Sequence, residues 1–192
     1  MDHQPELTFK VATEPGEFEQ VHRLNYTTFV EEIPQHSPNP NGVLVDTLLA
    51  QSTCVICLDG SRLVGMVTVC GRRPFSLEAK LPDLDSYLPP SPRPCEIRLL
   101  AIEKAYRGAQ VLGGLLAILI RHCLDAGYSV GLISAAASQQ RLYRHLGFVP
   151  FGPPLGTLTV PFQGMYITWE NLAKTAQGLG TRRQRFPLRS PT

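Results

Sequence analysis

Hydrophobic and polar residues alternate along residues 7–12, which is the two-residue period of a half-buried strand. After Thr13, the sequence Glu-Pro-Gly-Glu is typical of a helix start, because proline and acidic side chains suit the first turn. We expect this helix to continue to about Val30. Two β-rich runs, residues 53–58 and 62–70, are joined by Asp59-Gly60, a dipeptide that favours a tight hairpin. The first half thus predicts a strand, a helix and an antiparallel strand pair.

The second half of the chain alternates between strand-like and helix-like patterns. Ser138 is a suitable N-cap for a short helix that ends at Gly147. The prolines of residues 34–41 and 74–94 exclude regular structure and indicate two long loops. Together these elements predict an α/β fold, a mixed sheet with helices on both faces. The expected strands are residues 96–102, 128–134, 148–151 and 164–169, and the expected helices are residues 109–126 and 139–146.

Length and composition are those of one folded domain. The chain has 192 residues, of which 43% are hydrophobic and 18% charged. Its longest apolar run, residues 111–120, is about half as long as the ~20 residues that a membrane-spanning helix needs. The first ten residues lack the basic and apolar pattern of a secretory signal. We therefore expect a cytoplasmic protein without a membrane partner, with its domain formed by residues 1–176.

The net charge of +2 is unevenly distributed along the chain. Residues 177–192 contain four arginines and no carboxylate, and we expect them to form a basic, disordered tail. Without these arginines, 14 basic and 16 acidic side chains give residues 1–180 a charge of −2. A slightly acidic body is atypical of nucleic-acid binding, so no nucleic acid is expected as a partner.

The five cysteines lie in apolar stretches, as buried thiols do in reduced proteins. Cys54 and Cys57 form a C-x-x-C, but in a strand they would point to opposite faces. No second ligand pair has the spacing of a zinc site. The sequence therefore predicts neither disulfides nor a metal site.

Residues 96–114 carry the most informative pattern, a strand followed by a short polar loop and an apolar helix. The N-terminus of such a helix presents free backbone N–H groups, which bind phosphate oxygens. Lys104 and Arg107 add positive charge at the same place. Any strand-to-helix connection has free amides, so this pattern alone leaves a purely structural role open.

About 30 residues further on, the sequence Tyr143-Arg-His-Leu-Gly147-Phe148 adds a second signal. Together the two stretches resemble the GNAT acyltransferase superfamily, whose phosphate loop opens a helix and whose next short helix ends in Tyr-x-x-x-Gly-Phe. The resemblance extends over residues 7–170. It implies a mostly antiparallel sheet in which two central parallel strands splay into a V. It also implies an enzyme that moves an acyl group from a pantetheine thioester to an amine.

The resemblance also assigns residues to the donor, acyl coenzyme A with an acetyl or longer acyl group. The backbone of Leu100 and Ile102 would pair with the pantetheine amides, and the following loop would hold the phosphates. Tyr143 matches the residue that donates a proton to the departing thiolate; a core tyrosine is the alternative. The expected donor-binding residues are Leu100, Ile102, Lys104, Arg107, Gly108, Ala109, Gln110, Val111, Leu112 and Gly113.

The attacking amine must be neutral, so a carboxylate or a water chain is needed near the thioester. Glu96 is the first candidate, because it heads the central strand. Its surroundings also resemble the branch that makes acyl-homoserine lactones or N-acyl amino acids, although Arg98 and Leu99 depart from that pattern. Glu96 could instead pair with Arg98. Other candidates for the base are Glu31, Glu32 and His36.

The phosphate loop departs from the superfamily pattern, because Gln110 and Leu112 stand where glycines are expected. A Cβ restricts the approach of the backbone to a pyrophosphate. Coenzyme A could then bind in a shifted register at Gly113, or an acyl carrier protein with its single phosphate could be the donor. Such a carrier is acidic, and a basic face could dock it: Arg98, Lys104, Arg107, Arg141 and Arg144.

Three hypotheses follow. The first is an N-acyltransferase that uses acyl coenzyme A and a small amine such as an amino acid, with the two proline-rich segments as the acceptor wall. The second keeps this chemistry and uses an acyl carrier protein. The third is a degenerate module that binds pantetheine or a partner without turnover. An exposed last strand around residues 166–169 could also pair across a homodimer.

Overall fold

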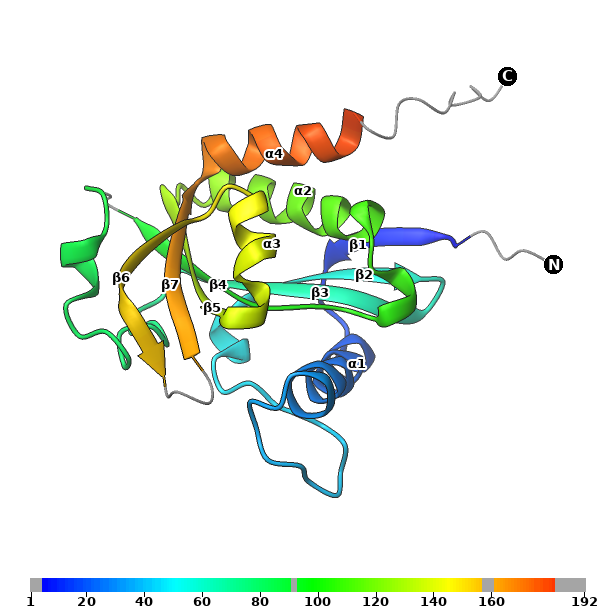
Figure 1. The fold of residues 1–192 in the computed structure, drawn as a ribbon. Coiled ribbons are helices and arrows are strands. Elements are labelled where there is room, and N and C mark those ends of the chain that lie inside the picture. The colour runs from blue at the N-terminus through cyan, green and yellow to red at the C-terminus, as the bar shows by residue number, and fades with distance from the viewer. Residues whose placement is uncertain (1–4, 91–92, 157–160, 182–192) are drawn as a thin grey trace.

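The computed structural model describes residues 5–90, 93–156 and 161–181. Its centre is a seven-stranded sheet in the order β1-β2-β3-β4-β5-β7-β6 (Figure 1). Every neighbouring pair is antiparallel except β4 and β5, which are parallel. This confirms the predicted mixed, mostly antiparallel sheet. The strands are β1 (Leu7–Val11), β2 (Thr53–Asp59), β3 (Arg62–Cys70), β4 (Pro94–Ile102), β5 (Val130–Ala136), β6 (Val149–Gly156) and β7 (Pro161–Thr168).

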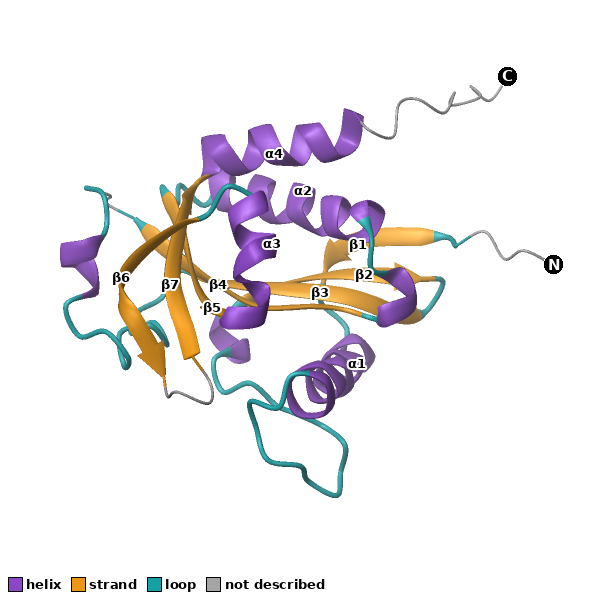
Figure 2. Ribbon diagram, in the orientation of Figure 1, coloured by secondary structure: helices purple, strands orange, loops and turns teal. Residues whose placement is uncertain are grey.

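Helices cover both faces of this sheet, as predicted (Figure 2). On one face, α2 (Ala109–Asp125) packs on β1, β2 and β3, and α4 (Trp169–Thr181) packs on α2. On the other face, α1 (Pro15–Tyr26) packs on β3 and β4 and continues into a wider π-helical turn, Thr27–Glu32. The short helix α3 (Gln140–His145) lies between β5 and β6 in sequence. Each face therefore has its own hydrophobic core.

The β2–β3 hairpin forms where Asp59-Gly60 predicted it. Gly60 has a φ of 60°, a left-handed conformation that glycine adopts without strain. Within β2, Cys54 packs into the core under α1, and Cys57 packs into the core under α2. Their opposite orientation confirms the prediction from strand geometry. All five cysteines are buried and free of disulfides.

Several strands are longer than predicted: β4 begins at Pro94 instead of residue 96, β6 extends to Gly156 instead of residue 151, and β7 begins at Pro161 instead of residue 164. Two further differences have local reasons. The α2 helix closes with a turn in which Gly127 has a φ of 70° and the Tyr128 N–H donates to the Cys123 carbonyl. β5 therefore begins at Val130, two residues later than expected. Ser138 is not an N-cap, because it lies in a 3-10 turn, Ala137–Gln139, that precedes α3.

The C-terminal region also corrects the prediction. β7 lies between β5 and β6, so residues 166–168 are inside the sheet and cannot pair across a dimer as an exposed edge. Trp169 is not the end of that strand; it begins α4. This helix extends to Thr181, so residues 177–181 are helical rather than part of a disordered tail. Residues 182–192, the remainder of the predicted tail, lie outside the described residues.

None of the helices described in the structure is long and apolar enough to cross a membrane.

Candidate functional site

The parallel strands β4 and β5 pair over only three residues each. Their register ends at Glu96 and Leu132, and beyond this point neither strand pairs with the other. In β4, the register with β3 shifts between Met66 and Thr68, and Leu99 takes a φ of 55°. A bulge of this kind bends a strand and increases its twist. The predicted V-shaped splay is therefore present, and it opens at the bulge.

The bulge also breaks the alternation of side chains along β4. Ile97 and Leu100 are three residues apart, yet both pack against the core under α2, whereas Leu99 packs against the core under α1. In a regular strand, residues three apart would face opposite sides of the sheet. The opening between β4 and β5 therefore connects the two faces.

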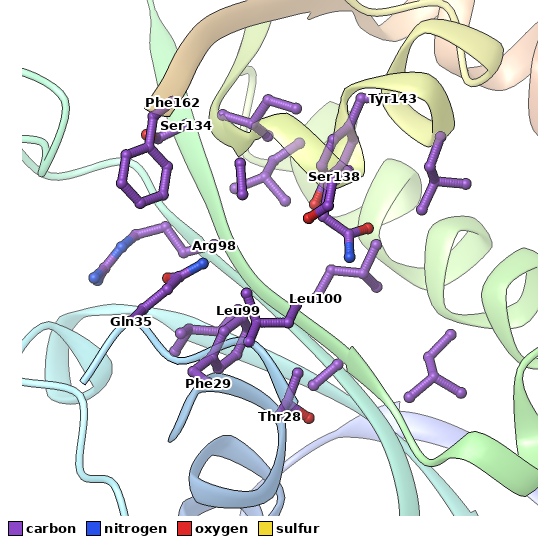
Figure 3. A pocket seen from close by; sticks show the side chains of 18 of the residues that line it. Thr28, Phe29, Gln35, Arg98, Leu99, Leu100, Ser134, Ser138, Tyr143 and Phe162 are labelled. Atoms are coloured by element: carbon purple, nitrogen blue, oxygen red, sulfur yellow. The ribbon is translucent and has the colours of Figure 1, made fainter. Parts of the chain in front are cut away.

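A cavity of about 960 Å³ occupies this opening. Its walls come from β4, β5, α3, the start of α2, the π-helical turn and both proline-rich segments. In Figure 3, Tyr143 and Ser138 lie at one end of the cavity, and Phe162 and Ser134 lie at the other. Both proline-rich segments line the cavity, through Gln35 of residues 34–41 and Lys80 of residues 74–94. That they form the acceptor wall stays a prediction.

Tyr143 projects from α3 into the cavity (Figure 3). Its ring packs edge to face on Phe148, with centroids 5.4 Å apart and an interplanar angle of 74°. The aromatic residue of the Gly-Phe pair thereby fixes the orientation of the tyrosine. Burial raises the pKa of Tyr143 to about 12, so its hydroxyl stays protonated at neutral pH. The residue can therefore donate a proton inside the cavity.

Glu96 lies at the point where the strands part, and it is only 1% exposed. Its carboxylate accepts hydrogen bonds from the Ser76 N–H and hydroxyl at 2.8 and 2.7 Å, and from the Leu77 N–H at 3.0 Å. The alternative partner, Arg98, is farther away, with its Nε 3.8 Å from a Glu96 oxygen. Glu96 thus lines the cavity and also anchors the second proline-rich segment to β4.

Arg98 belongs to the cavity, not to an external docking face. Its guanidinium donates two hydrogen bonds to the Asp46 carboxylate, at 2.8 and 3.0 Å, and only 19% of its side chain is exposed. Arg98 is therefore not available to the predicted basic docking face for an acyl carrier protein. Lys104, Arg141 and Arg144 are exposed.

Arg107 lines the cavity just before the start of α2. Its Nε donates to the Ile102 carbonyl at 3.0 Å, and its Nη2 donates to Glu32 at 2.5 Å. The Ile102 carbonyl, expected to bind pantetheine, is thus already engaged by Arg107. The ion pair joins the π-helical turn to the start of α2 across the cavity wall.

The other predicted donor-binding residues divide into two groups. Leu100, Ile102, Gly108 and Leu112 line the cavity together with Arg107. The second group lies elsewhere: Lys104 faces a smaller pocket of about 600 Å³, Val111 is 1% exposed in the core, and Ala109, Gln110 and Gly113 do not line the cavity. Space around the backbone is open at Gly108 and Gly113, where an added Cβ would meet nothing within 4 Å.

Among the cavity residues that were missing from the predicted site, three are polar residues with notable surroundings. The Lys80 Nζ donates a hydrogen bond to the Ser134 Oγ at 3.4 Å. Thr28 is 4% exposed, and its Oγ1 has no hydrogen-bond partner among the described residues. Lys80 lies in an irregular loop, where no periodicity marks the side that it faces. An isolated polar residue on a helix or strand likewise gives no local signal of a cavity. Of the alternative bases, Glu32 and His36 line the cavity, and Glu31 lines the smaller pocket.

The splayed sheet with a tyrosine in its opening has the architecture of a GNAT-type acyltransferase. Among solved structures, BjaI, a CoA-dependent acyl-homoserine lactone synthase with SAM and isopentyl-CoA, is 21% identical, with coverage of 92% of this chain and 90% of that one and a TM-score of 0.71. LasI, another acyl-homoserine lactone synthase, is 15% identical over 91% of this chain and 96% of its own, with a TM-score of 0.74.

The N-acyl amino acid synthase FeeM from uncultured soil microbes has a TM-score of 0.69 at 15% identity, with coverage of 91% of this chain and 99% of its own. At these identities the structures show a shared fold. No curated protein matches the chain. The model of the family "N-acyl amino acid synthase FeeM" matches residues 20–166, more than half of the sequence. The chain belongs to this family and is an acyltransferase.

Proposed function

We propose that this enzyme transfers an acyl group from acyl coenzyme A to the amine of a small molecule such as an amino acid. The observation that carries the proposal is the cavity through the β4–β5 opening, with Tyr143 inside it. The family contributes the reaction class, and the fold is shared with an acyltransferase whose solved structure holds isopentyl-CoA. Location in the cytoplasm and a domain formed by residues 1–176 remain predictions.

The donor would enter on the face covered by α2. The free N–H groups at the start of α2 and the Arg107 guanidinium suit phosphate oxygens, and Leu100 and Leu112 supply an apolar path for the pantetheine arm. The free β4 edge beyond Glu96 offers backbone groups to the pantetheine amides. The Ile102 carbonyl would become available only when Arg107 turns toward a phosphate.

The acceptor would enter on the opposite face, where α1 and the proline-rich segments meet. Its neutral amine attacks the thioester carbonyl carbon and forms a C–N bond, and the C–S bond then breaks. Tyr143 donates its phenolic proton to the leaving sulfur, and the amine loses a proton to Glu96 or to water. The phenol regains a proton from solvent, so the net products are an amide and a free thiol. Holding both substrates in one cavity supplies the remaining rate enhancement.

Thiol release tests this proposal. Purified enzyme is mixed with acyl coenzyme A of increasing chain length and with a panel of amino acids and simple amines, and free thiol is followed with a chromogenic disulfide. We expect amine-dependent release with at least one pair, and formation of the N-acyl product by mass spectrometry. Absence of release with every pair at micromolar enzyme would contradict the proposal. A parallel series with an acyl carrier protein tests the second donor.

A further inference from the structure

Lys80 differs from the other two cations that line the cavity. Asp46 neutralises Arg98, and Glu32 neutralises Arg107, in both cases by direct ion pairs. Lys80 makes no ion pair with any residue that the structure describes. Its ammonium is 3.4 Å from the Ser134 hydroxyl and 4.6 Å from the centre of the Phe162 ring.

The surroundings of Lys80 leave its charge without a contacting counterion. The residue as a whole is exposed, but partial burial of the ammonium lowers the pKa of Lys80. Glu96 attracts this charge and Arg98 opposes it. Because three donors from Ser76 and Leu77 already hold the Glu96 carboxylate, it does not move to contact the lysine without losing them. An incoming anion would therefore gain a prepared cationic partner.

The position of Lys80 identifies which substrate supplies that anion. Leu132 is the last residue of β5 that pairs with β4, and Ser134 lies two residues further along β5. Residues two apart in a strand point to the same face, so the Leu132 and Ser134 side chains share one face of the sheet. Leu132 packs with Phe75, Leu77 and Phe162, on the face away from α2. The phosphate-binding start of α2 lies on the other face. The anionic group that meets Lys80 therefore belongs to the acceptor, not to the phosphates of the donor.

We propose that Lys80 and Ser134 bind the carboxylate of the acceptor and thereby select amines that carry a nearby carboxylate over amines that do not. This inference rests on the proposed function and names two residues that determine its acceptor specificity. The ammonium and the Ser134 O–H are two neighbouring donors, and a carboxylate presents two oxygens. The Phe162 ring limits the directions that the lysine side chain can take.

Matched acceptors test the proposal. L-Leucine, L-phenylalanine and L-glutamine are each compared with their primary amide, in the wild-type enzyme and in Lys80→Met, Lys80→Arg and Lys174→Met. The amides have more acidic ammonium groups, so the informative quantity is the change that each variant causes, not the absolute preference. Lys174 is exposed on α4, where it pairs with Glu170, and serves as the control.

We expect Lys80→Met to raise KM for the amino acids about ten-fold or more, because it removes a charge-assisted hydrogen bond. KM for the amides should stay within two-fold of the wild-type value, and kcat should change little. Lys80→Arg should restore much of the lost affinity, and Lys174→Met should behave as wild type. Equal effects of Lys80→Met on acids and amides would show that the lysine has only a structural role and would overturn the proposal.

A binding measurement separates this inference from the reaction itself. Calorimetric titration compares N-acetyl-L-leucine with N-acetyl-L-leucinamide, as product mimics, on wild type and Lys80→Met. A lysine-dependent preference for the acid without any thiol release would sustain the carboxylate site and overturn the proposed reaction. Thiol release with no lysine-dependent preference in either measurement would overturn the carboxylate site alone.

Discussion

The phenolic hydroxyl of Tyr143 is well placed as a proton donor, because the residue projects into the cavity and the Phe148 ring holds its orientation. We expect Tyr143→Phe to lower kcat by about 10²–10⁴, the usual contribution of general acid catalysis. The dissociation constant of acyl coenzyme A should change little, because the ring remains. Stopped-assay kinetics and calorimetry measure the two quantities.

Tyr87→Phe is the matched control for this prediction, since Tyr87 is 41% exposed and does not line the cavity. A Tyr143→Phe enzyme with unchanged kcat would show that the departing thiolate needs no proton from this residue.

Glu96 combines two tasks that one variant can separate. Glu96→Gln places an amide N–H₂ opposite donors that now meet a carboxylate oxygen, so we expect the free energy of unfolding to fall by about 1–3 kcal/mol. Urea denaturation measures this loss. If Glu96 also accepts the proton of the amine, kcat falls in the protein that remains folded.

The control for Glu96 is Glu19→Gln, at an exposed position of α1 whose side chain forms no hydrogen bond or ion pair within the part of the chain that the structure describes. Unfolding curves of Glu96→Gln that match the wild type would contradict the anchoring role.

Residues with a local signature could be predicted, and those brought together by loops could not. Tyr143 follows from its spacing to Gly147 and Phe148, and Glu96 from its position near the start of a strand. Asp46 and Lys80 lie in segments without periodicity, so nothing local shows that Asp46 contacts Arg98 of β4 or that Lys80 contacts Ser134 of β5.

At the scale of elements, one ion pair connects the start of α2 to the π-helical turn after α1. Glu32 holds the Arg107 guanidinium that we propose for phosphate binding, so it competes with the donor. We expect Glu32→Gln to lower KM for acyl coenzyme A two- to five-fold, about the effect of a partly exposed pair. Steady-state kinetics at saturating amine measure it.

Glu31→Gln is the control for this competition, because Glu31 is exposed and lines the smaller pocket. A higher KM for the donor in Glu32→Gln would mean that the carboxylate positions Arg107 for the donor instead of competing with it.

The hydrophobic periodicity of the sequence predicted most helices and strands, but it did not predict the bulge in β4 that opens the cavity. Residues 94–102 have the composition of one continuous strand, and leucine rarely adopts the positive φ found at Leu99. The bulge depends on how β4 pairs with β3 while it leaves β5, which is a tertiary effect. The π-helical turn after Tyr26 could not be predicted either, because its side chains are equally compatible with an ordinary α-helix.

For the whole molecule, the cavity that connects both faces of the sheet would let the proposed donor and acceptor bind together. We therefore expect a sequential mechanism in which both substrates are present before any product leaves. Double-reciprocal plots at several fixed amine concentrations should intersect. Parallel lines, together with an acylated protein in the mass spectrum, would indicate a covalent intermediate and contradict direct transfer.

The resemblance of two short motifs predicted the overall sheet and its opening, because a shared fold constrains many residues at once. It did not predict which residues of the phosphate loop face the cavity. Leu112 does so and Val111 does not, and this choice depends on how α2 rotates against the sheet. The proposed acceptor side had no local signal either, since its residues come from segments far apart in the sequence, the π-helical turn, both proline-rich segments and β5.

The strand at one edge of the sheet, β6, contains Pro150, Pro153 and Pro154. Proline has no backbone N–H to offer a further strand, so this edge is a poor template for adding another chain. At high concentration, copies of the enzyme should therefore not aggregate by pairing strands at the β6 edge. A partner that recognises this edge would have to do so through side chains.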